Sequence, residues 1–293
     1  MRARTKLTVL VGIATAMLGT SAGLHAQLSS ARDPGPRGGP PAAGGSLGTH
    51  VARDNVSFRI PTPTFGGGLV EAIPDSAILA NRAAYAATKA AAGIPGRPNR
   101  NGNDGTITRF GWKAQNKSLL LFSGEGAALA ALSAIEKFAF FMRFLAPPTP
   151  STAAPGGAAS IAHGRQPFMS TGCALCHTPT LSTGNAGVAA LANREVDLYS
   201  DLLLHGMGPD LADDIVQGEA GPDEFRTAPL WGLGQRIFFL HDGRTTDLGE
   251  AIRAHRSGAG GGFRASEANV VIDRYNALGE RDRQDLFNFL RSL

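Results

Sequence analysis

The sequence contains very little cysteine: Cys173 and Cys176 are the only two among 293 residues. Two cysteines cannot build the framework of several disulfides found in small secreted domains, and they cannot supply both Cys-x-x-Cys arms of a structural zinc site. A disulfide between them would close so short a loop that it would stabilise almost nothing. Any special chemistry of the thiols therefore belongs to this one motif.

The chain also lacks a strong net charge. Its formal charge falls from +4 to +1 when Arg2, Arg4 and Lys6 at the start are left out. No basic segment remains that would attract a polyanion, so the composition argues against nucleic-acid binding.

A long hydrophobic run is missing as well. The longest apolar stretch near the start, Leu7 to Leu18, is too short to cross a bilayer. With the basic residues before it and small residues after it, residues 1–26 have the pattern of a signal peptide, with cleavage expected between Ala22 and Ala26. We therefore expect a periplasmic protein with peripheral or no membrane contact, the alternative being an uncleaved anchor.

The two cysteines lie in the segment Gly172 to His177, which reads Cys-x-x-Cys-His and is the attachment signature of a c-type haem. Two thiols at this spacing can both add to the vinyl groups of the porphyrin, and His177 then lies under the iron. A thioredoxin-like redox pair would need a βαβ context, which the sequence does not show. The motif thus predicts one covalent haem c bound by Cys173, Cys176 and His177.

Glycine and proline divide the chain into five segments. Residues 27–53 are rich in both and predict a linker, because they can bury too little apolar surface to offset their ordering entropy. Residues 54–146 predict a partial, irregular and partly helical N-terminal region that packs on the rest. Residues 147–157 predict a second linker, and residues 158–293 a cytochrome c-like haem domain. The expected fold class is mainly α.

Three helices are predicted by apolar periodicity. In residues 127–145, Ile135, Phe138, Met142 and Leu145 form one stripe before a Pro-Pro stop. Asp247 caps a short helix, with Glu250 as its capping-box partner and His255 on the apolar face. Residues 280–291 form the last helix, with Leu286, Phe289 and Leu290 buried.

The sequence patterns offer two main candidates for the sixth ligand of the iron and do not decide between them. His255 lies on the apolar face of a short helix, where a histidine must find a partner. Met207 lies in a Gly/Pro loop, a setting that lets a thioether reach the iron. His205, beside this loop, is a third option that more simply forms local hydrogen bonds, and a vacant position would leave room for peroxide.

The segment Arg109 to Ala114 interleaves aromatic and cationic residues and has two interpretations. It could contact a cofactor or its propionates, or it could be a loop packed on the core through Phe110 and Trp112.

Several segments together resemble the bacterial di-haem oxidoreductases, also described as peroxidases or "thiol oxidoreductases", which are relatives of di-haem cytochrome c peroxidase. The most specific of them are Tyr199 to Pro209, Arg226 to Gly234 and His241 to Arg244. The resemblance covers most of the chain in pieces. It departs from the family where members carry an earlier Cys-x-x-Cys-His, which this sequence does not have.

The resemblance implies a choice of ligand. In the related peroxidases the second axial residue of the C-terminal haem follows a His-Asp-Gly motif by about the length of a helix, which here corresponds to His255. His255 is therefore preferred to Met207. The same analogy implies that His241 and Arg244 steer the haem propionates or the electron route.

The expected function is that of an exported c-type cytochrome, with one haem held by His177 and His255, that passes electrons to a redox partner protein. One alternative is a haem peroxidase that reduces hydrogen peroxide, which needs a displaceable sixth ligand and an acid/base group such as His205 or Glu219. The other is a degenerate or non-haem binding protein. Absorption spectra with carbon monoxide separate the first two, and a haem stain tests the third.

Overall fold

The computed structural model describes residues 7–11, 26–29, 56–124, 132–153 and 155–293. The expected signal peptide and first linker lie mostly outside these residues. Within the described part, helices make up most of the regular structure, joined by long irregular segments, in line with the expected mainly α class. No helix in that part is long and apolar enough to cross a bilayer.

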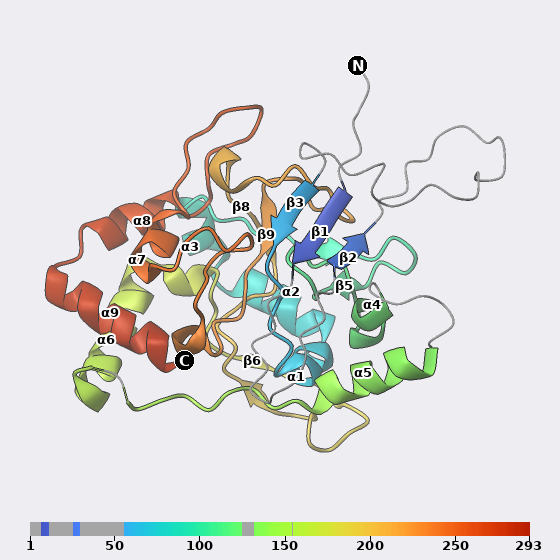
Figure 1. Cartoon of the computed structure of the whole chain (residues 1–293). Coiled ribbons are helices and arrows are strands. Elements are labelled where there is room, and N and C mark those ends of the chain that lie inside the picture. Colours follow the sequence, from blue (N-terminus) through green and yellow to red (C-terminus); the bar gives the residue numbers. More distant parts are fainter. Residues whose placement is uncertain (1–6, 12–25, 30–55, 125–131, 154) are drawn as a thin grey trace.

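The helices form two groups on opposite sides of the molecule (Figure 1). The N-terminal group is α1 (Gly67–Ala72), α2 (Asp75–Ala84), α3 (Ala86–Ala91), α4 (Leu119–Gly124) and α5 (Leu132–Phe144). The C-terminal group is α6 (Gly157–Thr171), α7 (Leu248–Arg253), α8 (Asn269–Asn276) and α9 (Glu280–Ser292). Short 3-10 turns are η4 (Cys173–Leu175), η5 (Pro209–Leu211) and η6 (Leu233–Gln235). Helix α3 lies with the C-terminal group, so the N-terminal region reaches that side too (Figure 1).

In the described residues the strands are short and form four small sheets. Strand β1 (Leu7–Val11) lies between β2 (Ala26–Ser29), which is antiparallel to it, and β3 (Val56–Arg59), which is parallel to it. The other sheets are antiparallel pairs: β4 (Asn99–Arg100) with β5 (Ile107–Thr108), β6 (Leu181–Ser182) with β7 (Glu195–Val196), and β8 (Leu204–Gly206) with β9 (Glu224–Arg226).

Helix α5 only partly agrees with its predicted stripe. Ile135 and Met142 are buried, but Phe138 is 50% exposed and Ala139 takes its place in the core. Ile135, Ala139 and Met142 follow the i, i+4, i+7 spacing of one helix face, whereas Phe138 points away from it. The predicted beginning of this helix, residues 127–131, lies outside the described residues.

The C-terminal helices agree better with their predictions. Asp247 caps α7 by accepting a hydrogen bond of 2.6 Å from the Glu250 backbone N–H, as expected. The Glu250 carboxylate does not complete the capping box and instead accepts a hydrogen bond from Thr245. In α9 the residues Leu286, Phe289 and Leu290 are all buried, which confirms the prediction that they face inward. They pack in one cluster with Phe168 of α6.

The largest core joins the two halves of the sequence. Its N-terminal members include Ile73, Ile78, Leu119 and Met142, and they pack with buried residues that follow the second predicted linker: Leu181, Val196, Leu198, Leu202, Leu203 and Trp231. A main-chain bridge adds to this contact, since Arg97 and Leu204 exchange both backbone hydrogen bonds, at 3.0 and 2.7 Å. The N-terminal region therefore shares its core with the C-terminal half.

Helices α6 and α9 cross so closely that only glycine fits at position 164. A Cβ atom there would lie 1.9 Å from the backbone carbonyl oxygen of Asp285, which cannot move without α9.

We expect Gly164→Ala to lower the free energy of unfolding by about 1–3 kcal/mol, the usual cost of overpacking, because α6 and α9 must separate. Chemical denaturation followed by circular dichroism measures it. The matched control is Gly187→Ala, whose added methyl group meets nothing within 4 Å, and equal stabilities of the two variants would contradict the packing argument.

The buried side chain of Lys113 connects residues 109–116 to residues 221–224. Lys113 is fully buried, and its Nζ donates hydrogen bonds to the carbonyl oxygens of Gly221, Pro222 and Glu224 at 2.7, 3.0 and 3.0 Å. It also lies 3.2 Å from the Asp213 carboxylate, which pairs with Arg59 as well. Burial lowers the pKa of Lys113 from 10.5 to about 8, although the Asp213 charge opposes the shift.

This depressed pKa predicts a pH dependence of stability. Between pH 8 and 10.5 the folded protein releases the Lys113 proton while the unfolded chain keeps it. The free energy of unfolding of the wild type should then rise with pH relative to Lys113→Met, by up to about 1.4 kcal/mol per pH unit. Parallel pH profiles of the two proteins in urea denaturation would contradict this.

Candidate cofactor site

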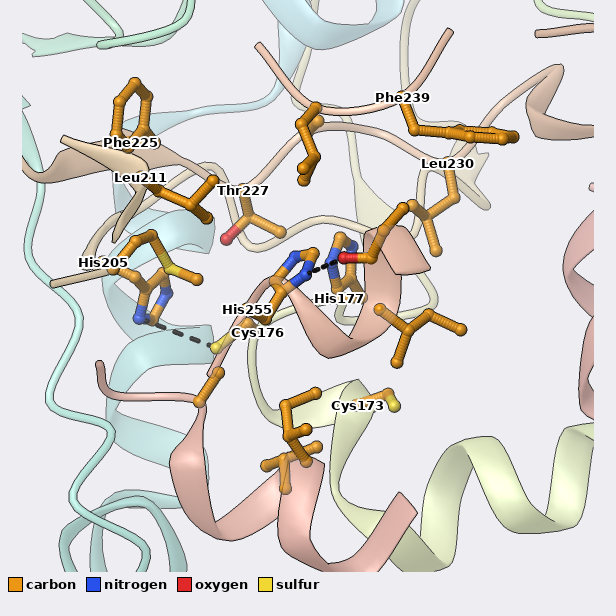
Figure 2. A pocket seen from close by; sticks show the side chains of 18 of the residues that line it. Cys173, Cys176, His177, His205, Leu211, Phe225, Thr227, Leu230, Phe239 and His255 are labelled. Carbon is orange, nitrogen blue, oxygen red and sulfur yellow. Dashed lines mark hydrogen bonds between the residues drawn. The ribbon is translucent and has the colours of Figure 1, made fainter. Parts of the chain in front are cut away.

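A deep pocket lies between the C-terminal helices and the segments that carry β8 and β9. Its wall is mostly aliphatic and aromatic, interrupted by two thiols, the imidazoles of four histidines and a few other polar side chains. Figure 2 labels three of these histidines, His177, His205 and His255. The apolar residues include Ile94 and Trp112 from the N-terminal region and, from the C-terminal half, Phe168, Met207, Leu211, Phe225, Leu230, Leu233, Phe239, Leu248, Ile252, Val271, Leu286 and Leu290. Such a wall suits a large, flat, apolar molecule.

The Cys-x-x-Cys-His motif forms a tight turn at the pocket wall. Helix α6 ends at Gly172, which adopts a left-handed conformation (φ 100°) as helix C-caps commonly do. The 3-10 turn η4 follows at once, and the His177 backbone N–H donates to the Cys173 carbonyl at 2.9 Å. Both thiols and the His177 ring thereby line the same pocket. Burial raises the pKa of the Cys173 thiol, which keeps it protonated at neutral pH.

His177 has its ring oriented by one hydrogen bond. Its Nδ1 lies 3.0 Å from the Tyr199 carbonyl oxygen, and because a carbonyl can only accept, Nδ1 must carry the proton. The other nitrogen, Nε2, is then the basic one. Burial, followed by repulsion from His255, lowers the pKa of His177 to about 4, so the ring is neutral at physiological pH.

His255 is arranged in the same way. It lies just beyond the end of α7 rather than on the helix itself, and its Nδ1 donates to the Ala251 carbonyl at 2.8 Å. Burial lowers its pKa, so it too presents a neutral ring with Nε2 unprotonated. Figure 2 shows the two imidazoles together in the middle of the pocket, whose wall contains both residues.

These features fit an iron porphyrin. Two neutral imidazoles offer Nε2 atoms from opposite segments, and each has its Nδ1–H hydrogen-bonded to a carbonyl, the usual support of a histidine metal ligand. Both thiols of the attachment motif are at the wall, and the remaining lining is apolar. Among the residues that the structure describes, no group of three or more histidine, cysteine or acidic side chains could hold a metal ion.

The other predicted site residues divide into two sets. Met207 and His241 line the pocket. Met207 packs among Trp112, Leu211 and Phe225, and the His241 ring contacts that of Phe225 at a tilt of 30°, with 4.3 Å between the ring centres. Burial lowers the pKa of His241 to about 4. Arg244 does not line the pocket, because the Asp242 carboxylate holds its side chain toward the surface. Its guanidinium donates to Asp242 and to the Asp210 carbonyl, both at 2.7 Å.

The segment Arg109 to Ala114 divides its two aromatic residues between the core and the pocket. Phe110 belongs to the large core, while Trp112 lines the pocket and donates from Nε1 to the Ile60 carbonyl at 2.7 Å. Glu219, considered as an acid/base group, lies at the surface with Arg97 and is not part of the pocket wall.

His205 is clamped between two carboxylates at one edge of the pocket. Its Nε2 lies 3.0 Å from the buried Asp201 carboxylate and its Nδ1 lies 2.7 Å from that of Glu267. Although burial opposes it, the pKa of His205 is raised well above 6.5 by the charge of the Asp201 carboxylate and by the hydrogen bond to it. The ring thus forms hydrogen bonds with neighbouring side chains, as expected from its position beside the loop. Its Nδ1 also lies 3.6 Å from the Cys176 sulfur.

Two arginines in the wall were missed by the sequence analysis. Arg226 and Arg236 both line the pocket, yet neither follows a pattern that marks a buried cation. The one available signal was their place in the apolar stretch from Phe225 to Leu240, where a charged side chain is unusual.

Residues 123–293 match the protein-family model described as "Di-haem oxidoreductase, putative peroxidase". No curated protein gives a significant match.

Two solved structures are similar at low identity. Hydrazine synthase of Kuenenia stuttgartiensis, pressurised with 20 bar xenon, is 17% identical, with 54% of this chain and 55% of that chain covered and a TM-score of 0.34. The chain thus spans little more than half of that relative. A MauG-like protein associated with microbial copper homeostasis is 16% identical, with 83% and 91% covered and a TM-score of 0.41.

The clamp around His205 makes a testable stability prediction. His205→Leu leaves the Asp201 carboxylate buried with only the Leu203 N–H and a distant Lys89 ammonium group, 3.9 Å away. We expect it to lower the free energy of unfolding by about 3 kcal/mol, as breaking a buried ion pair does. Adding Asp201→Asn should restore part of this loss, and a double variant less stable than His205→Leu would refute the explanation.

Proposed function

The chain belongs to the di-haem oxidoreductase family, and from this premise we propose that it is an exported c-type cytochrome that carries one covalent haem and transfers electrons. The observation that carries the proposal is the pairing of His177 and His255 in one apolar pocket, each with Nδ1 bound to a carbonyl and Nε2 available, beside Cys173 and Cys176.

The side chains of this chain would divide the work. Cys173 and Cys176 would hold the porphyrin by thioether bonds, while His177 and His255 would bind the iron from its two faces. When bound, the haem supplies a one-electron couple of Fe(III) and Fe(II). Burial keeps both imidazoles neutral, and the Tyr199 and Ala251 carbonyls fix their tautomer and orientation, so that little has to move between oxidation states.

The apolar wall has a second role. It excludes water from the iron ligands, and two imidazole ligands would keep the reduction potential below that of a histidine/methionine pair. Met207, the other ligand considered, is packed against Trp112, Leu211 and Phe225, which supports His255 as the ligand and Met207 as part of the wall.

The proposed haem attachment and electron transfer also imply export and a redox partner. Haem c is attached outside the bacterial cytoplasm, so residues 1–26 would direct the chain to the periplasm. A redox partner protein would exchange the electron there. Mass spectrometry of the mature N-terminus measures the cleavage, which we expect between Ala22 and Ala26.

A peroxidase reaction at the same haem is the second candidate, and the family description favours it. It requires the sixth position to open for hydrogen peroxide and a group to move its protons. Of the two acid/base groups considered from the sequence, His205 lines the pocket, and it already has two carboxylate partners.

Absorption spectroscopy of the purified protein tests the proposal. Covalent haem should survive denaturing electrophoresis, and the wild type should be low-spin and inert to carbon monoxide. His255→Ala removes one axial nitrogen and should give a high-spin species that binds carbon monoxide.

The matched control is Met207→Leu, which preserves the volume of the wall and should keep the low-spin spectrum. A low-spin His255→Ala together with a high-spin Met207→Leu would transfer the ligand to Met207. A wild type that binds carbon monoxide readily would favour the peroxidase, and a colourless one would refute haem attachment and leave a non-haem binding protein.

A further inference from the structure

Two arginines in the pocket wall, one buried and one partly buried, have no carboxylate partner among the described residues. Arg226 is 7% exposed and Arg236 is half-buried, and neither forms a salt bridge within that part of the chain. The other buried cations nearby are paired, as Arg59 is with Asp213 and Arg109 with Asp75. Arg226 and Arg236 therefore differ from the pattern that this protein follows elsewhere.

Their hydrogen bonds go to backbone carbonyls and leave donors over. Arg226 uses Nε for the Gly111 carbonyl at 3.0 Å and Nη1 for that of Thr227 at 3.2 Å. Arg236 uses Nη2 for the carbonyls of Pro229 and Trp231, while its buried Nε has no partner among the described residues. A guanidinium has five N–H donors, so each arginine can still bind an anion.

The arrangement costs free energy unless an anion is present. Burial lowers the pKa of each guanidinium to about 10, and in Arg226 repulsion from Arg236 adds to the effect. Two like charges that repel each other in an apolar wall destabilise the fold, and a carboxylate between them would remove both the repulsion and the unpaired charge.

Their position matches one edge of the haem pocket. Both arginines line it, and both also line a smaller adjoining cavity, bounded by Phe65, Trp112 and Trp231. The two arginines thus lie where the haem pocket and the smaller cavity meet. Arg244, the candidate from the sequence, is outside the pocket and already bound to Asp242.

We propose that Arg226 and Arg236 are the binding site for the propionate carboxylates of the haem, an assignment that rests on the proposed haem attachment. Arg-carboxylate pairs are charge-assisted and can be bidentate, which suits the free donors of both side chains. The haem is thereby oriented about the axis through the iron, with its thioether edge at Cys173 and Cys176 and its carboxylate edge at the arginines.

This assignment has an electrochemical consequence. Positive charge beside the haem favours Fe(II) over Fe(III), because the reduced centre carries one positive charge fewer. Without an arginine the propionate would be less compensated, and the potential should fall.

The test is the midpoint potential at pH 7 of the intact haem-loaded protein and of Arg226→Gln, Arg236→Gln and the double variant. We expect each single variant to shift the equilibrium at least about tenfold toward the oxidised form, which is a fall of about 59 mV for a one-electron couple, with a larger fall in the double variant. Each single variant carries the test by itself if the double variant does not accumulate.

Two controls separate charge from structure. Arg226→Lys and Arg236→Lys keep the charge and should stay near the wild-type potential, while Arg244→Gln, outside the pocket, should leave it unchanged. Potentials of the glutamine variants equal to that of the wild type, with lowered thermal stability, would mean that the arginines only bind carbonyls and would overturn the assignment. A fall in Arg244→Gln alone would move the site there.

The proposed function fails separately. A wild type without covalent haem in the stain overturns it and this assignment together, whereas haem-positive variants with unchanged potentials overturn the assignment only.

Discussion

The hydrogen bonds from two histidine Nδ1 atoms to backbone carbonyls determine what the pocket can do. Tyr199 and Ala251 supply those carbonyls, and each fixes one imidazole in the tautomer that leaves Nε2 basic. The Tyr199 carbonyl belongs to an irregular turn in which Tyr199 and Leu202 have left-handed φ angles of 53° and 59°. The side chains of Ser200 and Asp201 support that turn by accepting the N–H groups of Leu202 and Leu203. The chemistry of His177 thus depends on a turn more than twenty residues away.

The pocket is also a product of both halves of the chain. Ile94 and Trp112 close it from the N-terminal region, and the bridge between Arg97 and Leu204 holds that region against β8. Lys113 and its three carbonyl acceptors fix the next segment to residues 221–224. Residues that look like a separate region in the sequence therefore form part of the wall, and changes in them should be felt at the site.

The sequence was most informative where a local rule applies. The attachment motif, the Asp247 cap and the face of α9 need only neighbouring residues to be recognised, and the structure has the cap and the face where they were expected. The family resemblance drawn from short motifs is also confirmed. The prediction that Phe138 lies on the buried face of α5 was wrong, because Ile135 and Ala139 define the face that meets the core. The positions of Arg244 and Arg226 depend on long-range contacts with the carbonyls of Asp210 and Gly111, which no spacing along the chain encodes.

The enclosure of the attachment motif has a consequence for biogenesis. Cys173 and Cys176 lie at a wall completed by residues as late as Leu286 and Leu290. A maturation enzyme needs open access to both sulfurs, so for the proposed attachment the porphyrin must be joined before α9 docks against α6. In the proposed export the motif would cross the membrane before α9, so that attachment would precede the docking of α9 on α6.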